Sequence, residues 1–116
     1  MRQPFGITFD AMASRCEIRL AAPDEARASA WAQSAIDEVR RIEAKYSRYR
    51  DDSVVTAINR GAGAGPVPVD AETQALLGYA DALWRDSGGR FDATSGVLRR
   101  AWDFRRGIVP QDAALD

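Results

Sequence analysis

Residues 5–20 read FGITFDAMASRCEIRL. On both sides of the centre of this stretch, apolar residues alternate with polar or small ones, which is the period-two pattern of half-buried strands. The apolar positions are Phe5, Ile7, Phe9, Cys16, Ile18 and Leu20. The stretch therefore predicts two antiparallel strands that are joined through residues 11–14.

Two long amphipathic helices are predicted after these strands. Pro23 and Asp24 provide a turn and a cap for the first helix, and Asp70 caps the second. The second helix ends at Gly88-Gly89, because a glycine pair stops a helix readily. Both segments show apolar residues at the helical spacing of three or four. These are Ala28, Ala32, Ala35, Val39, Ile42 and Tyr46 in the first, and Leu76, Leu77, Ala80, Leu83 and Trp84 in the second. The predicted fold class is α+β.

A short helix and a glycine-rich loop are expected between the long helices. Residues 51–53 can cap a helix that ends near residues 59–61. Residues 61–66 read GAGAGP, which resembles a dinucleotide-binding loop only superficially, because Pro66 stands where such a loop opens a helix. A flexible connection is expected here, followed by a short extended edge at residues 67–69.

Composition excludes several classes of protein. The chain has 116 residues, 46% of them hydrophobic, and a net charge of -1, which is typical of one folded domain and argues against a nucleic-acid-binding surface. It has no histidine, so Ser-His and Cys-His nucleophilic machinery is excluded. The single Cys16 excludes an internal disulfide.

The two ends of the chain suggest its location and extent. No apolar run reaches the ~20 residues that cross a bilayer, and residues 1–4 lack the apolar region of a signal peptide. The sequence as written is therefore expected to stay in the cytoplasm and to have no membrane segment. Residues 111–116 resemble the opening of a further helix, which predicts a chain truncated at its carboxy-terminal end.

The most detailed motif lies after the second long helix. Residues 88–98 read GGRFDATSGVL, and Trp102-Asp103-Phe104 follow. The glycine pair lets the backbone approach a ligand closely, and the next residues present an apolar ring, a carboxylate and a hydroxyl in one short turn.

This motif resembles a signature of the FAD:protein FMN transferases, the ApbE-like flavin transferases. Two further stretches are similar to the same family in the same order. Residues 11–14, AMAS, are similar to its Ala-Met-Gly-Thr motif, and residues 38–59 are similar to its first long helix and the turn that follows. The chain is therefore identified as the amino-terminal portion of a flavin transferase domain, residues 1–116, with an ApbE-like, T-fold-related α+β fold in which antiparallel strands pack with two long helices.

The resemblance implies an activity and its partners. Members transfer FMN from FAD to a Thr or Ser of a target flavoprotein and release AMP. FAD is then the substrate and Mg²⁺ the metal, whose ligands are expected outside this chain. No catalytic residue and no metal ligand are assigned here. Relatives are often exported or lipid-anchored.

The resemblance also implies flavin-nucleotide contacts at Met12, Tyr49, Arg90, Phe91 and Asp92. The residues by themselves leave other roles open. Met12 could fill the core between the strands, Tyr49 could pack, and Phe91 could plug the core after the glycine pair. A buried carboxylate at Asp92 would need a hydrogen bond or a ligand. Trp102 and Phe104 are expected to be structural.

Departures from the family pattern and alternative functions complete the prediction. Ala13 and Ser14 stand where the family usually has Gly and Thr, and a left-handed Ala13 would cost about 1–2 kcal/mol.

The alternative functions are a non-catalytic module that binds flavin nucleotide or a partner protein, and an inactive truncated product. Uncovered apolar faces could also support self-association.

Overall fold

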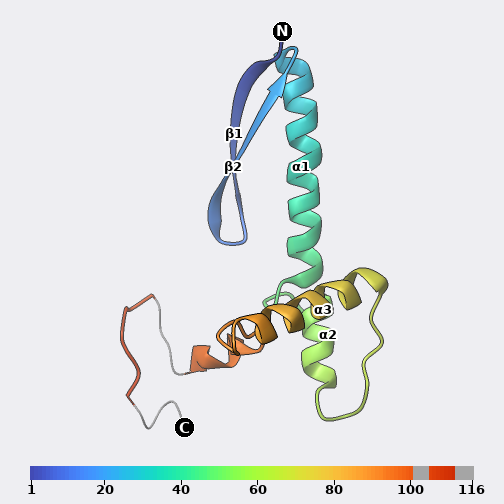
Figure 1. Ribbon diagram of the computed structural model, residues 1–116, viewed down its shortest axis with the longest axis vertical. Coiled ribbons are helices and arrows are strands. Elements are labelled where there is room, and N and C mark those ends of the chain that lie inside the picture. Colours follow the sequence, from blue (N-terminus) through green and yellow to red (C-terminus); the bar gives the residue numbers. More distant parts are fainter. Residues whose placement is uncertain (101–104, 112–116) are drawn as a thin grey trace. The chain divides into compact units, whose positions relative to one another are not determined.

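The computed structural model describes residues 1–100 and 105–111, with the backbone alone for residues 99 and 100. Its elements follow one another in the order predicted, two strands and then the helices, and the α+β fold class is confirmed (Figure 1). They are β1 (Gln3–Ala11), β2 (Ser14–Ala22), α1 (Glu25–Tyr46), α2 (Val54–Gly61), α3 (Ala71–Asp86) and the 3-10 helix η1 (Ser95–Arg100). The chain divides into an amino-terminal unit, Met1–Pro68, and a carboxy-terminal unit, Val69–Asp116, each described by itself.

The predicted hairpin is confirmed. β1 and β2 pair antiparallel, and the register places the apolar residues of one strand opposite those of the other, since Ile7 faces Ile18 and Phe9 faces Cys16. All four of these side chains are half-buried, whereas their neighbours along each strand are exposed. One face of the hairpin is therefore apolar and available for packing.

Helix α1 covers the hairpin. It packs against both strands, and the hairpin turn lies alongside the carboxy-terminal half of the helix (Figure 1). Asp24 caps the helix by accepting a hydrogen bond from the backbone N–H of Arg27 at 2.9 Å. Ala28 and Ala32 are buried, and their small side chains let the helix approach the sheet closely.

The predicted apolar stripe of α1 is wrong at one position. Ala35 is exposed, and Ile36 is 7% exposed and belongs to the core. Steps of four residues from Ala28 through Ala32 lead to Ile36, and this face buries the larger side chain. Burying an isoleucine contributes about 1.5–3 kcal/mol.

The region after α1 agrees with prediction except at its end. Ser53 caps α2 by accepting a hydrogen bond from the Thr56 N–H at 3.1 Å, and α2 packs against α1. The expected extended edge at residues 67–69 is not a strand. In the described part of the chain the sheet consists of β1 and β2, and residues 67–69 do not pair with it.

The carboxy-terminal unit contains α3 and the turn after it. Asp70 caps α3 by accepting a hydrogen bond from the Thr73 N–H at 3.0 Å. The helix ends at the predicted glycine pair, where Gly88 and Gly89 have φ of 64° and 81° and the Gly89 N–H donates to the Trp84 carbonyl at 2.8 Å. Leu76, Leu77 and Trp84 of the predicted stripe are 45–50% exposed, and Ala80 and Leu83 are half-buried.

The last elements lie partly outside the described residues. The short helix expected from Val97 to Trp102 is the 3-10 helix η1, which begins two residues earlier, at Ser95. Trp102, Phe104 and residues 112–116 of the expected final helix are outside the described part of the chain.

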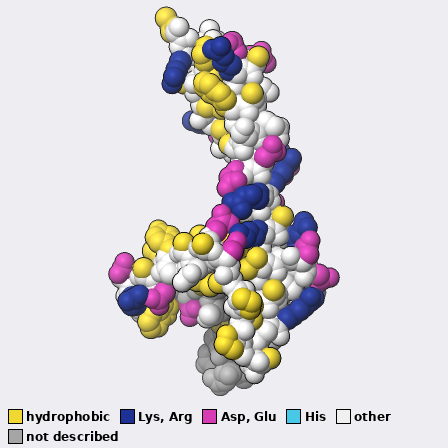
Figure 2. Space-filling view, turned by 90° about the vertical axis from the view of Figure 1, so that its right-hand side faces the viewer, with side chains coloured by type: hydrophobic (Ala, Val, Ile, Leu, Met, Phe, Trp, Pro, Cys, Tyr) yellow, Lys and Arg dark blue, Asp and Glu magenta, His cyan; other side chains and the backbone are white. Residues whose placement is uncertain are grey.

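The surface carries charges of both signs. On the face that Figure 2 shows, Lys and Arg side chains lie interspersed with Asp and Glu, and hydrophobic side chains lie between them. Among the residues described, no helix combines the length and apolar character needed to cross a bilayer.

Candidate functional site

The hairpin turn, Met12 and Ala13, has a strained backbone. Met12 has φ of 54° and Ala13 has φ of 55°, and they are the two non-glycine residues with positive φ in the described chain. A two-residue loop between strands favours this geometry, because it matches the twist of the strands. For residues other than Gly, Asn or Asp, the left-handed region costs about 1–2 kcal/mol each. Ala13 is therefore left-handed, which is the conformation for which the sequence predicted a cost at this position.

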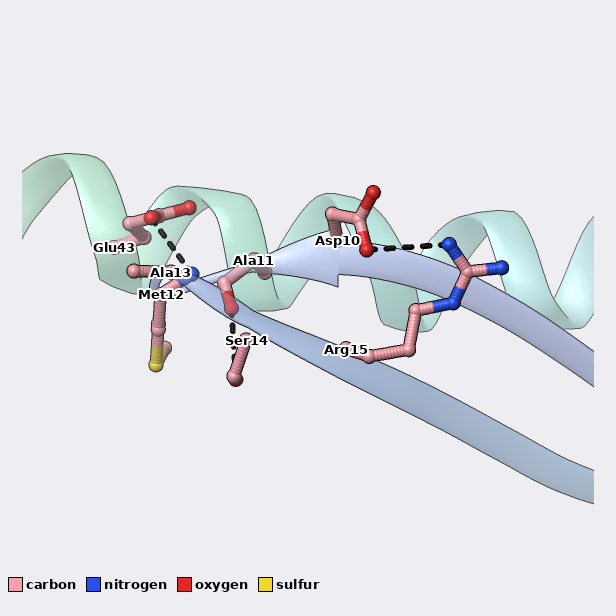
Figure 3. A pocket seen from close by; sticks show the side chains of 7 residues that line it. All are labelled: Asp10, Ala11, Met12, Ala13, Ser14, Arg15 and Glu43. Atoms are coloured by element: carbon pink, nitrogen blue, oxygen red, sulfur yellow. Dashed lines mark hydrogen bonds and ion pairs between the residues drawn. The ribbon is translucent and has the colours of Figure 1, made fainter.

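A carboxylate on α1 holds this turn. The backbone N–H of Met12 donates a hydrogen bond to Oε1 of Glu43, 31 residues away in sequence, at 2.8 Å (Figure 3). On the other side of the turn, the Ser14 hydroxyl donates to the Ala11 carbonyl at 3.1 Å. The turn is thus fastened both to its own strand and to the helix.

Around the turn lies an open hollow of about 410 Å³. Its lining presents a thioether, two carboxylates and a guanidinium, and Arg15 forms an ion pair with Asp10 at 3.3 Å (Figure 3). The Met12 side chain is 53% exposed, so it does not fill the core between the strands and is available to a ligand. The lining residues are Asp10, Ala11, Met12, Ala13, Ser14, Arg15 and Glu43.

Tyr49 lies just past the end of α1, and it does not line this hollow. Its side chain is 72% exposed, so it is not a core residue, and the Arg48 guanidinium carbon lies 5.1 Å from the centre of its ring. The segment is well held, because the Arg50 carbonyl accepts hydrogen bonds from the hydroxyls of Ser53 and Thr56. Tyr49 is therefore an exposed ring on an ordered turn.

The Arg50–Asp52 ion pair strengthens the same turn. Two guanidinium nitrogens, Nε and Nη2, contact the two carboxylate oxygens at 2.9 Å each. The hydrogen bond from Arg50 and its positive charge lower the pKa of Asp52.

In the carboxy-terminal unit, Asp92 is exposed, and it needs no ligand to satisfy it. Its Oδ1 accepts hydrogen bonds from the N–H of Thr94 at 2.8 Å and from the Thr94 hydroxyl at 2.6 Å. These bonds favour the ionised carboxylate and lower the pKa of Asp92. Asp92 is therefore not buried, and of the two partners left open for it, a hydrogen bond or a ligand, the turn itself provides the hydrogen bond.

Phe91 and Arg90 also point to solvent. Phe91 is 46% exposed and does not plug the core, and its N–H donates to the Ser87 hydroxyl at 2.8 Å. Arg90 is exposed. Met12 and Tyr49 belong to the amino-terminal unit and Arg90, Phe91 and Asp92 to the other. Their convergence on one ligand stays a prediction.

Glu43 is the site residue that the sequence interpretation missed. Its position at helical spacing on α1 is typical of a surface charge, yet it is half-buried and bonded to the hairpin turn. The available signal was its place in the family-like stretch of residues 38–59. Its partner could not be deduced from spacing, because the contact joins segments far apart in the chain.

A metal site is not formed by the described residues. In residues 1–100 and 105–111, no group of three or more His, Cys, Asp or Glu side chains is arranged to hold an ion. The donor set present here therefore does not fit the divalent metal that the family resemblance implies.

Comparison with known proteins identifies the family. The model of the ApbE family matches residues 12–116, which include the hairpin turn, Glu43, Tyr49 and the turn around Asp92. The chain belongs to the ApbE family.

Curated relatives of this ApbE-family chain are FAD:protein FMN transferases. The one from Treponema pallidum (strain Nichols) is 37% identical over 95 residues, covering 77% of this chain and 26% of the relative. The one from Chlamydia pneumoniae is 32% identical over 62 residues, covering 53% of this chain and 20% of the relative. The chain thus spans about a quarter or less of the length of these relatives.

Solved ApbE structures share the fold. The ApbE protein of Thermotoga maritima superposes with a TM-score of 0.81 at 26% identity, over 96% of this chain and 37% of that one. The flavin transferase ApbE of Vibrio cholerae gives a TM-score of 0.76 at 24% identity, over 99% of this chain and 39% of that one. The apo flavinyl transferase ApbE of Pseudomonas stutzeri gives 0.73 at 23% identity, over 98% and 38%.

Proposed function

We propose that this chain is the amino-terminal portion, residues 1–116, of an FAD:protein FMN transferase domain. In the reaction, the hydroxyl oxygen of a Thr or Ser on a target flavoprotein attacks the phosphorus of the FMN half of FAD. The new bond joins that oxygen to phosphorus, the bond between phosphorus and the bridging oxygen breaks, AMP leaves, and the hydroxyl proton is released. This chain supplies part of the FAD-binding surface.

The proposed contacts divide by chemistry. Met12 and Tyr49 provide a polarizable thioether and an aromatic face for the flat ring systems of FAD. Arg90 provides a cation for the pyrophosphate, and Phe91 adds a second aromatic surface. Asp92, held ionised by Thr94, is a hydrogen-bond acceptor for the hydroxyls or ring N–H groups of the nucleotide.

The observation that carries this proposal is the family match over residues 12–116 together with the exposure of these side chains. Met12, Tyr49 and Phe91 are apolar or aromatic and are 46–72% exposed, although nearby small residues such as Ala11 are buried. These side chains are therefore accessible to a ligand.

The metal belongs to another part of the protein in this proposal. A divalent cation supplies neutralisation of phosphate and leaving-group charge in phosphoryl transfer. The described residues offer no site for it, so no step is assigned to a metal or a general base of this chain.

Activity is the first test. The chain is incubated with FAD, Mg²⁺ and an acceptor flavoprotein, and the acceptor is analysed by intact mass. We expect no detectable FMN addition, whereas a full-length family member such as the Vibrio cholerae enzyme, run in parallel, should modify the same acceptor. Modification by this chain alone would overturn the assignment of the catalytic groups to another part of the protein.

Binding is the second test. FAD fluorescence is titrated with the chain, and quenching that saturates is expected. Met12→Ala and Tyr49→Ala should each weaken binding about three- to tenfold, the size of one lost ring contact. Tyr79→Ala is the matched control, because Tyr79 is 65% exposed on α3 and outside the proposed contacts. Unchanged fluorescence at high protein concentration would reject the binding surface. Saturable binding that Met12→Ala and Tyr49→Ala leave unaltered would reject these contacts.

A further inference from the structure

The hairpin turn combines a backbone that is costly to hold with an exposed side chain that is proposed to contact FAD. Met12 and Ala13 are both left-handed, with φ of 54° and 55°. Neither residue is of the Gly, Asn or Asp type that such loops prefer. Holding this geometry therefore requires a stabilising contact from elsewhere in the fold.

Glu43 supplies that contact. The Met12 N–H is 2.8 Å from Oε1 of Glu43, and a hydrogen bond to a carboxylate is stronger than one between neutral groups. Glu43 is half-buried on α1, a helix that packs against both strands. The acceptor is thus carried by a rigid element and fixes the turn relative to the helix.

The same carboxylate also lines the hollow that Met12 borders. Figure 3 shows Glu43 on the α1 side of the turn, bonded to the backbone of Met12, while the Met12 side chain extends away from it. The bond therefore acts on the backbone and leaves the thioether free. Other polar groups at the turn serve different contacts, since Arg15 binds Asp10 and Thr8 on the strands.

We propose that Glu43 is a positioning residue for flavin binding: its carboxylate holds the left-handed Met12–Ala13 turn so that Met12 is presented to FAD. This inference rests on the proposed function. It assigns to Glu43 a role through the backbone of Met12 and none in contact with FAD itself.

The decisive experiment is a rescue. Glu43→Ala should weaken FAD binding, measured by fluorescence titration of the full chain, by about tenfold, the effect of losing one hydrogen bond to a charged group. Ala13→Gly relaxes the turn without touching the carboxylate, because glycine adopts left-handed φ readily. The double variant Glu43→Ala/Ala13→Gly should recover binding to within about threefold of the wild type.

Two controls separate positioning from other effects. Glu38→Ala removes an acidic side chain of the same helix, whose partner is Arg41, and should leave the FAD affinity unchanged within about twofold. Glu43→Gln keeps an oxygen that can accept the Met12 N–H and should lie between the wild type and Glu43→Ala. Loss of affinity in Glu43→Ala that Ala13→Gly does not restore would overturn the positioning role, as would no loss at all.

A second readout keeps this inference separable from the proposed function. The amide proton of Met12, followed by NMR without FAD, should change its chemical shift in Glu43→Ala, because it loses its hydrogen-bond acceptor, and should keep it in Glu38→Ala. If the wild type fails to bind FAD, the proposed function fails, and this resonance still tests whether Glu43 holds the turn. A Met12 amide chemical shift that is the same in the wild type and in Glu43→Ala would overturn the hydrogen bond itself.

Discussion

Two of the turns that carry proposed FAD contacts, the hairpin turn and the turn after α3, are built in opposite ways. The hairpin turn places Met12 and Ala13, neither of them glycine, in the left-handed region and depends on a carboxylate 31 residues away. The turn after α3, residues 87–94, uses Gly88 and Gly89 for its left-handed positions, and its hydrogen bonds span only a few residues. One turn depends on tertiary structure, and the other is encoded locally.

The difference has a physical basis. Glycine adopts positive φ at little cost, so a turn that contains it needs no outside support. Alanine and methionine must be compensated, and in this chain the compensation comes from α1. Replacing glycine by alanine in the turn after α3 should therefore lower the free energy of unfolding, and replacing alanine by glycine in the hairpin turn should raise it.

The largest effect is expected at Gly89. Gly89→Ala should lower the free energy of unfolding by about 1–2 kcal/mol, because φ is 81° there. Crowding is not the cause, since an added Cβ would lie 3.5 Å from Nε1 of Trp84, an ordinary contact. The measurement is urea unfolding followed by tryptophan fluorescence.

Gly78→Ala is the matched control for that prediction. Gly78 lies within α3, and an added Cβ there meets nothing within 4 Å. The same substitution should raise stability by about 0.5–1 kcal/mol at this position, because alanine favours a helix interior. Equal effects at the two glycines would contradict the assignment of the cost to backbone conformation.

A smaller effect of opposite sign is expected in the hairpin turn. Ala13→Gly should raise the free energy of unfolding by about 1 kcal/mol, because it removes left-handed strain at φ of 55°. Urea unfolding followed by circular dichroism measures the change. Destabilisation by Ala13→Gly would show that the turn is not strained and would remove the contrast between the two turns.

The smallest effect is expected when the pH is lowered, and it concerns the turn after α3. Hydrogen bonds from Thr94 lower the pKa of Asp92, so ionised Asp92 stabilises the folded turn above the ordinary aspartate range, near pH 4. That contribution is lost as pH falls through the depressed pKa. NMR titration of the Asp92 carboxyl carbon should show the low pKa, and Thr94→Val should raise it toward the ordinary value. An ordinary pKa in the wild type would contradict the hydrogen-bonded turn.

Local features of the fold could be predicted well. The caps at Asp24, Ser53 and Asp70 and the end of α3 at Gly88-Gly89 were predicted from residue type and position, because each depends on hydrogen bonds within a few residues. The α+β class and the ApbE family were predicted as well. The edge strand expected at residues 67–69 was wrong, because pairing with a sheet depends on tertiary structure and this segment does not pair with β1 or β2.

Features that depend on packing were harder to predict. Helical spacing allowed either Ala35 or Ile36 on the inner face of α1, and only contact with the strands selected Ile36. The candidate contacts Met12, Tyr49, Arg90, Phe91 and Asp92 came from family resemblance, and their joint action on FAD is still a prediction. Their exposure is a structural finding that spacing could not provide.

The sequence alone determined the strands, the helix limits and the glycine turn, because alternation, capping residues and glycine act over short distances along the chain. Only the tertiary structure decided which face of α1 is buried and that Glu43 holds the Met12–Ala13 turn. Those outcomes depend on packing α1 against the hairpin, which brings together residues that no local pattern relates.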